Sequence, residues 1–227
     1  MKEINHFKTL DYVISYPDGY SPDKTYPLLI HLHGAGTRGD NIDLIYDTAV
    51  GPLGEVNRGH DLPFIIAAPQ CRGKMWFEIS ETVLEFIDDV SARPDVDRSR
   101  IYMCGISMGG YACWYFAMFR SGLLAAIMPV CGGGMPAFAS YLKDLPVWAH
   151  HGALDSVVDV SETLNMVKAL RRLGSEVKLT IYPDRDHDCW TPTFANPEVY
   201  EWLLSHRKAG AALPAEADGM NTGERFG

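Results

Sequence analysis

A serine set between two glycines is the feature of this sequence best suited to chemistry. Gly105, Ser107 and Gly109 form a Gly-x-Ser-x-Gly motif that directly follows a short apolar run and directly precedes a helical pattern. At a strand-to-helix junction this motif makes a sharp turn that exposes the serine hydroxyl, and a side chain at either glycine would collide with neighbouring backbone. A bare motif often holds only a helix-capping serine. The flanking strand and helix favour the alternative, in which Ser107 is a nucleophile.

The histidine that such a nucleophile requires is predicted at position 187. A serine hydroxyl attacks efficiently only when a histidine, oriented by a carboxylate, removes its proton. His187 follows the last predicted strand and precedes the last predicted helix, so we expect it at the same carboxyl edge of the sheet as Ser107. His150 and His151 end another strand and could reach this edge. They precede the acid candidates, however, and so break the Ser, acid, His order of this motif.

The acid is expected in the loop that follows the strand ending at Gly152. Asp155 stands three residues past that glycine, at the exit of the strand. Asp159 lies next to the following helix, where a carboxylate commonly caps exposed N–H groups. The aspartates that flank His187 are too close to it in sequence to bend back onto its ring, and they read as a solvated acidic loop. We therefore predict Asp155, with Asp159 as the alternative.

Two backbone amides are predicted to stabilise the oxyanion of an acyl-transfer intermediate. The segment from His33 to Gly36 reads His-Gly-Ala-Gly at the end of an apolar run, so the amide of Ala35 is one expected donor, with Gly36 as its substitute. The amide of Met108, at the start of the helix after Ser107, is the other. Preorganised donors of this kind contribute roughly 3–4 kcal/mol each.

These residues need a scaffold in which strands and helices alternate. The sequence shows this alternation of strand and helix patterns. Several strand runs are continuously apolar, as in parallel strands buried on both faces. The predicted strands cover residues 11–17, 27–34, 63–69, 100–105, 125–131, 146–152 and 177–183. The predicted helices cover residues 79–92, 108–121, 161–174 and 197–207. The expected fold class is α/β, with a mostly parallel central sheet and helices on both faces.

Two segments depart from this alternation. Residues 35–62 are long, polar and Gly-rich, which predicts a functional loop with a short helix near residues 42–49. Residues 208–227 are poor in apolar groups, so we expect a disordered tail after a catalytic domain formed by residues 1–207.

The connection between the strands at 125–131 and 146–152 is too short to hold a cap domain. An open cleft is therefore expected, bounded by the 35–62 loop, the turn at residues 132–136 and nearby aromatic side chains. Trp76, Phe77 and Trp190 are the candidate substrate wall, although aromatic residues fill cores more often than they contact ligands.

The charge composition of the chain indicates which classes of binding partner are disfavoured. Lys and Arg number 20 and Asp and Glu 29, and the net charge of −9 disfavours nucleic acid and anionic membranes as partners. The first 17 residues lack the apolar run of a signal peptide, and no segment approaches the length of a membrane span, so a cytoplasmic location is expected. The cysteines have no zinc-type spacing, which predicts reduced thiols and no metal, with a Cys71–Cys189 bond left open.

The motifs at the four sites together resemble those of the α/β-hydrolase superfamily. They read HLHGAG, GISMGG, HHGALDSVV and DRDHDCW in this order and extend over the chain to about residue 207. The sequence is most similar to compact bacterial carboxylesterases of the phospholipase/carboxylesterase, predicted-peptidase or dienelactone-hydrolase-like groups, akin to feruloyl esterases and polyhydroxybutyrate depolymerases. The resemblance implies a triad of Ser107, Asp155 and His187. Dienelactone hydrolases proper use a cysteine nucleophile, so the serine argues against lactone specificity.

The expected function is that of a serine carboxylesterase. It would hydrolyse short-chain or aromatic carboxylic esters, as small-molecule substrates, through an acyl-enzyme and without a cofactor. A serine peptidase or acyl-peptide hydrolase is the alternative, because the same triad cleaves amides. A noncatalytic ligand-binding module is a third possibility that the complete set of site residues disfavours. Oligomeric state is not readable from the sequence.

Overall fold

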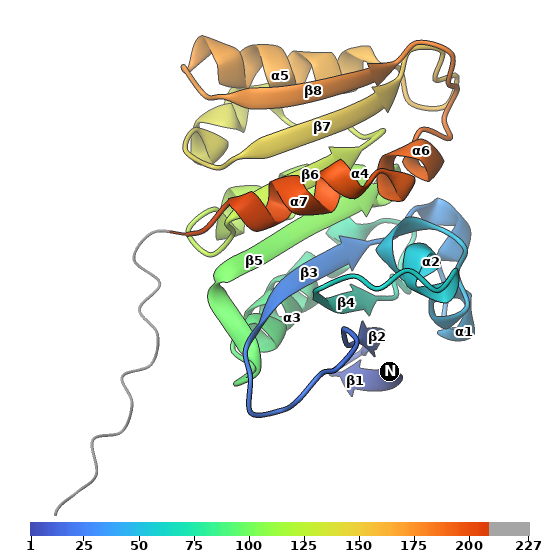
Figure 1. The fold of residues 1–227 in the computed structure, drawn as a ribbon. Coiled ribbons are helices and arrows are strands. Elements are labelled where there is room, and N and C mark those ends of the chain that lie inside the picture. Colours follow the sequence, from blue (N-terminus) through green and yellow to red (C-terminus); the bar gives the residue numbers. More distant parts are fainter. Residues whose placement is uncertain (209–227) are drawn as a thin grey trace, which may run out of the picture.

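The computed structural model describes residues 1–208, and its centre is one eight-stranded sheet (Figure 1). The strand order is β1-β2-β4-β3-β5-β6-β7-β8. The strands from β3 to β8 run parallel, whereas β2 pairs antiparallel with β4, and β1 antiparallel with β2. The strands are β1 (Lys2–Phe7), β2 (Leu10–Ser15), β3 (Tyr26–Leu32), β4 (Ile65–Pro69), β5 (Val96–Ile106), β6 (Ala126–Val130), β7 (Val147–Gly152) and β8 (Val177–Tyr182).

Helices cover both faces of this sheet, which confirms the predicted α/β class. One face packs against α3 (Ser80–Ser91), α4 (Met108–Arg120) and α5 (Ser161–Arg172). The other packs against α1 (Asp43–Tyr46), α2 (Gly51–Asn57), α6 (Trp190–Ala195) and α7 (Pro197–Ser205). Three short 3₁₀ helices, η1 (Ala35–Thr37), η2 (Trp76–Ile79) and η3 (Pro136–Leu142), lie in the connections.

Strand β3 shows why the central strands are so apolar. Leu28 and Ile30 belong to the core under α3 and α4, whereas Leu29 between them belongs to the core on the opposite face. All three side chains are fully buried. Because successive side chains of a strand point to opposite faces, a strand covered on both sides buries every residue. Each such side chain contributes about 1.5–3 kcal/mol.

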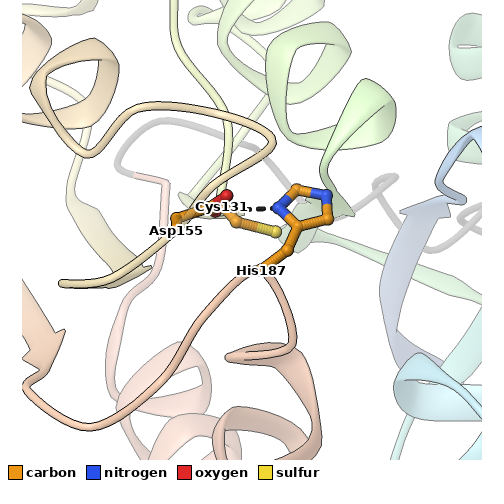
Figure 2. A group of neighbouring side chains, drawn as sticks. All are labelled: Cys131, Asp155 and His187. Carbon is orange, nitrogen blue, oxygen red and sulfur yellow. Dashed lines mark hydrogen bonds and ion pairs between the residues drawn. The ribbon is translucent and has the colours of Figure 1, made fainter.

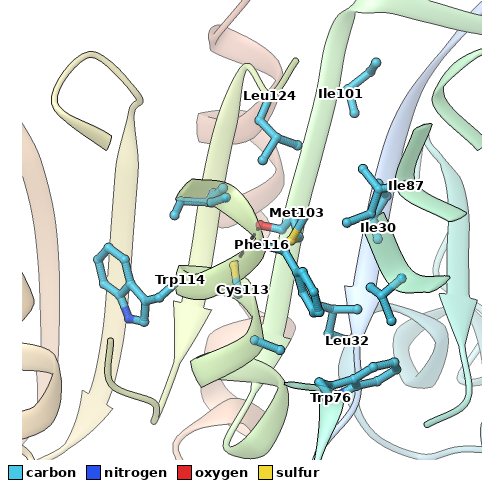
Figure 3. Close-up of a cluster of buried hydrophobic side chains, with 14 of the residues drawn as sticks. Ile30, Leu32, Trp76, Ile87, Ile101, Met103, Cys113, Trp114, Phe116 and Leu124 are labelled. Atoms are coloured by element: carbon cyan, nitrogen blue, oxygen red, sulfur yellow. Dashed lines mark hydrogen bonds between the residues drawn. The ribbon is translucent and has the colours of Figure 1, made fainter. Parts of the chain in front are cut away.

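Helix α4 is held in place by unusually complete burial. Trp114 and Phe116 are fully buried against the sheet (Figure 3). The Cys113 thiol also donates to the Met103 carbonyl of β5 across 3.6 Å, which fastens the helix to the strand that precedes it. The strand, turn and helix around the serine motif are therefore packed tightly against one another.

The structure adds elements that the sequence analysis did not predict. Strand β1 lies at the sheet edge and is half-exposed, so it lacks the apolar run of a central strand. Helices α2 and α6 were also missed, because each is only 7 or 6 residues long and begins within a Pro-containing stretch. Residues 209–227, most of the predicted tail, lie outside the described residues.

Parallel strands bring their carboxyl ends to one edge of the sheet, and the predicted site residues follow those ends. Between β6 and β7 the chain forms only a turn and η3, so residues 1–208 contain no cap domain over this edge. None of the helices in this range is long and apolar enough to cross a bilayer.

Candidate active site

Ser107 sits at the junction of β5 and α4 in a strained conformation. Its φ of 55° and ψ of −115° lie in a region that non-glycine residues rarely adopt. Two hydrogen bonds hold it there: its N–H donates to the Val130 carbonyl of β6 at 2.9 Å, and its carbonyl accepts from the Tyr111 N–H at 3.0 Å. Sheet and helix together thus fix the direction of the hydroxyl.

The glycines on either side of this serine allow the backbone of α4 to contact the backbones of β5 and β3. A Cβ atom at Gly105 would lie 2.0 Å from the Gly109 carbonyl oxygen, and one at Gly109 would lie 1.9 Å from the Leu32 carbonyl oxygen of β3. Both distances are far inside van der Waals contact. The motif therefore needs glycine for close packing of β3, β5 and α4, as the sequence analysis predicted.

Ser107, His187 and Asp155 form one hydrogen-bonded chain. The Ser107 Oγ lies 2.9 Å from His187 Nε2, and His187 Nδ1 lies 2.8 Å from Asp155 Oδ2. The carboxylate accepts the Nδ1–H, which leaves Nε2 free to accept the serine proton. Asp159, the alternative acid, instead accepts the Ser161 N–H at the start of α5 and stands apart from the histidine.

Asp155 is prepared to remain ionised. Its burial alone would raise the carboxyl pKa, but hydrogen bonds from His187 and from the amides of Val157 and Val158 outweigh that effect and hold the pKa below its ordinary value. Its side chain is fully buried, whereas that of His187 is 18% exposed and open to the cleft. The negative charge is thus kept where it can stabilise a protonated imidazole.

The loop that carries His187 is fastened by an aspartate that the sequence analysis assigned to a solvated loop. Asp186 Oδ1 accepts the His187 N–H at 2.8 Å and the Ser156 N–H at 2.7 Å. It therefore ties the histidine loop to the loop of Asp155. Its alternation with other aspartates in the sequence gave no sign of this role.

Cys131 lies beside the acid and the histidine, as Figure 2 shows. Its Sγ and one atom each of Asp155 and His187 lie within 4.8 Å of one another, a spacing compatible with metal ligands. His187 Nδ1 already donates to Asp155 Oδ2, and burial raises the pKa of the Cys131 thiol. Cys131 therefore packs beside the hydrogen-bonded chain of Ser107, His187 and Asp155. All five cysteines are free, so the Cys71–Cys189 bond left open above is not formed.

The two predicted oxyanion donors lie near Ser107, one in the wall of the cleft and one at the next position in the chain. Ala35 lines the cleft together with Gly34 and Gly36. Met108 is the first residue of α4, and the first N–H groups of a helix have no acceptor within it. Its amide is therefore available at the positive end of the helix dipole.

His33 shapes the backbone that carries Ala35. Its Nε2 accepts the Cys71 N–H at 2.9 Å, so its Nδ1 carries the proton and donates to the Gly34 carbonyl at 2.6 Å. Burial lowers the pKa of His33 to about 4, which keeps this neutral form over the ordinary pH range. The histidine of the His-Gly-Ala-Gly segment is thus a structural brace.

The cleft above Ser107 has a volume of about 370 Å³ and mostly apolar walls. Ile45, Thr48 and Val50 contribute from α1 and the segment that follows it, Val157 from the acid loop, and Trp190 from α6. The 35–62 segment thus bounds the cleft, as predicted. Its lining residues could not be chosen from the sequence, because their apolar side chains resemble ordinary helix packing.

The predicted aromatic wall is right only in part. Trp190 lines the cleft and meets the His187 ring edge-on, with centroids 5.2 Å apart. Trp76 is fully buried and donates to the His33 carbonyl at 3.1 Å, so its prediction as a substrate contact is wrong. Phe77 packs against Tyr115 of α4, away from the residues that line the cleft. The turn at residues 132–136 does not line it either.

Comparison with known proteins gives this arrangement a family. The family model described as phospholipase/carboxylesterase matches residues 67–199, more than half of the chain, and this range includes Ser107, Asp155 and His187. The chain belongs to the phospholipase/carboxylesterase family. The α/β-hydrolase resemblance predicted from the sequence motifs is confirmed.

Individual relatives share only about a quarter of their aligned residues with this chain. Feruloyl esterase C of Emericella nidulans is 25% identical over 134 residues, 57% of this chain and 49% of that protein. Feruloyl esterase B of Piromyces equi is 26% identical over 171 residues, 68% of this chain and 31% of that protein. The chain thus spans half or less of the length of these two relatives.

Solved structures of both esterases and peptidases have a fold similar to that of this chain. A thermostable esterase superposes with a TM-score of 0.72 at 28% identity and covers 91% of this chain and 63% of its own. Dipeptidyl peptidase 4 of Porphyromonas gingivalis superposes with a TM-score of 0.68 at 17% identity, covering 90% of this chain and 35% of its own. At that identity the likeness extends to the fold alone.

Proposed function

We propose that this protein is a serine carboxylesterase that cleaves short-chain or aromatic carboxylic esters through an acyl-enzyme. The observation that carries the proposal is the hydrogen-bonded chain from Ser107 Oγ through His187 to Asp155, with distances of 2.9 and 2.8 Å, at the base of an apolar cleft. Its family membership and relatives named feruloyl esterases support the same activity.

Acylation begins with attack of Ser107 Oγ on the ester carbonyl carbon. His187 Nε2 takes the hydroxyl proton, and Asp155 stabilises the imidazolium that results. The amides of Ala35 and Met108 donate to the carbonyl oxygen as it becomes negative. His187 then gives its proton to the departing alcohol, which leaves an ester between Ser107 and the acyl group.

Deacylation repeats these steps with water. His187 removes a proton from a water molecule in the cleft, the hydroxide attacks the acyl carbonyl, and the same amides hold the oxyanion. The proton returns to Ser107 Oγ as the carboxylic acid leaves. The acyl group is expected against the apolar walls near Ile45 and Val50, where a short alkyl chain or an aromatic ring fits the cleft volume.

The test is turnover of 4-nitrophenyl butyrate by purified variants. Ser107→Ala and His187→Ala should each lower kcat by on the order of 10⁴-fold or more, and the double variant should lose little beyond either, because the residues act as a unit. Asp155→Asn should lose about 10⁴-fold, whereas its matched control Asp159→Asn should keep nearly full activity. Clearly additive losses, or an active Asp155→Asn protein, would contradict the assignment.

A second readout separates esterase from the other candidate functions. A fluorophosphonate should label the wild type at Ser107 and leave Ser107→Ala unlabelled, which a noncatalytic binding module would not do. Hydrolysis of a peptidyl 4-nitroanilide with a kcat/KM comparable to that for 4-nitrophenyl butyrate would favour a peptidase instead.

A further inference from the structure

Asp155 has a second histidine neighbour in addition to His187. His151 stands at the end of β7, and its Nε2 lies 3.1 Å from Asp155 Oδ2, the oxygen that accepts from His187 Nδ1 at 2.8 Å. The side chains of His151 and Asp155 are both fully buried. One carboxylate oxygen is therefore shared by two imidazole rings, only one of which belongs to the proposed triad.

The partners of His151 Nε2 show that this nitrogen carries a proton. Nε2 lies 2.9 Å from the Val158 carbonyl oxygen as well as 3.1 Å from Asp155 Oδ2. A carbonyl and an ionised carboxylate only accept hydrogen bonds. An unprotonated Nε2 would place its lone pair against both oxygens in a buried site, which is costly.

Thr163 of α5 decides the state of the other ring nitrogen. Its Oγ1 lies 2.7 Å from His151 Nδ1 and also 2.7 Å from the Gly132 carbonyl oxygen. A separation of 2.7 Å between two oxygens is that of an O–H···O hydrogen bond, so the single threonine proton lies toward Gly132. Thr163 Oγ1 must then accept from Nδ1, and both nitrogens of His151 carry protons.

We infer that His151 is a buried imidazolium that pairs with Asp155 and serves as a positioning residue for the triad. This inference rests on the proposed function. A charge in a buried site is tolerated only when it is paired and hydrogen-bonded, and His151 meets both conditions through Asp155, Val158 and Thr163. The pair holds the Asp155 carboxylate at Oδ2, the same oxygen that accepts from His187.

The positive charge also affects the base. Asp155 attracts a proton onto His187, and His151 offsets part of that negative charge. Loss of the His151 charge is therefore expected to move the acid limb of the pH–rate profile, which the test below measures.

Other groups around the pair do not remove this effect. Tyr111 of α4 and Cys131 after β6 face Asp155, and burial raises the pKa of both, Tyr111 to about 12, so both are neutral. Asp159 faces His151 from an exposed position where water screens its charge. Glu162 of α5 makes its contact with Tyr111.

The test compares three variants by the pH dependence of kcat/KM for 4-nitrophenyl butyrate. His151→Gln keeps a donor near Val158 but removes the charge, and Thr163→Val removes the acceptor of Nδ1 without changing side-chain shape. His150→Gln is the matched control, because His150 is the buried neighbour on the same strand and has no contact with Asp155 in the structure.

We expect His151→Gln to lower kcat by about 10- to 100-fold with KM within about twofold of the wild type. Its acid limb should move to higher pH by roughly half a unit or more, and that of Thr163→Val in the same direction. The His150→Gln limb should stay in place. An unshifted limb in folded His151→Gln protein would overturn the charged state.

A direct measurement covers the case in which the variant does not fold. In wild-type protein with ¹⁵N-labelled histidine, NMR should find both ring nitrogens of His151 protonated at pH 7, and a single unprotonated nitrogen would refute the inference. This readout needs no turnover. Absence of ester hydrolysis by the wild type would therefore count against the proposed function and leave the charge of His151 to be judged separately.

Discussion

At the scale of single residues, Gly109 shows how closely the serine turn is packed. Its Cα faces the last residues of β3, and an added Cβ would lie 1.9 Å from the Leu32 carbonyl oxygen and 2.7 Å from that of His33. Backbone atoms cannot swing aside as a flexible side chain can. Because the same backbone leads into the Ala35 loop, any displacement would be passed to the proposed oxyanion site.

Gly109→Ala should therefore reduce both stability and turnover. We expect a loss of about 3 kcal/mol in the free energy of unfolding, at the upper end for overpacking, and a fall in kcat larger than for any surface glycine. Urea denaturation and ester turnover measure the two effects. Gly122→Ala is the control, because its Cβ meets no atom within 4 Å, and it should change stability by less than about 0.5 kcal/mol. Equal behaviour of the two variants would contradict this account.

At the scale of elements, the 35–62 segment determines the size of the cleft. It folds into η1, α1 and α2 and supplies Ile45, Thr48 and Val50 to the walls. Opposite it, Val157 is 68% exposed at the rim. A site of about 370 Å³ with an open rim and no cap within residues 1–208 can bury only a few methylenes of an acyl chain.

Short esters should accordingly be preferred. Each buried methylene contributes about 0.8 kcal/mol, so kcat/KM should rise over the first few carbons and then level off or fall. 4-Nitrophenyl butyrate should exceed the palmitate ester, with no jump in rate when substrate passes its solubility limit. Val157→Phe should shift the optimum to shorter chains, whereas Leu154→Phe, exposed outside the cleft, should not. Marked activation by micelles would instead identify the 35–62 segment as a lid.

The three residues of the proposed triad could be predicted from the sequence because position along an alternating fold constrains them. Ser107, Asp155 and His187 each follow a central strand, and parallel strands bring such residues to one edge. Individual side-chain contacts could not be predicted from the sequence. Nothing in the pattern near Trp76 distinguishes a core indole from a substrate wall. The ring partners of His151 come from the acid loop and from Thr163 of α5, and their residue types alone do not indicate such contacts.

At the scale of the whole molecule, three of the buried histidines are neutral at pH 7. Burial lowers the pKa of His31 to about 3, that of His33 to about 4 and that of His150 to about 3. In the unfolded chain these groups titrate near 6.5. Between that value and the folded pKa values, the unfolded state binds more protons, so the contribution of these three histidines to stability is full above about pH 6.5 and declines as the pH falls.

The free energy of unfolding should therefore drop by about 2 kcal/mol for each of these histidines between pH 7 and pH 5. Urea denaturation at several pH values measures the decline. His150→Gln should show a shallower dependence by about one such contribution, whatever its stability at pH 7. Parallel curves for His150→Gln and wild type would rule out this origin of acid sensitivity.

The conformation of Ser107 has an evolutionary consequence. A non-glycine residue held at φ 55° and ψ −115° costs on the order of 1–3 kcal/mol, a penalty that glycine largely escapes. Selection for stability alone would favour glycine at this position, and the hydroxyl would be lost with the strain. A serine at this position is what the proposed activity requires, because its hydroxyl is the nucleophile in that proposal. At position 107, a substitution that increases stability would therefore remove the hydroxyl that the proposed reaction needs.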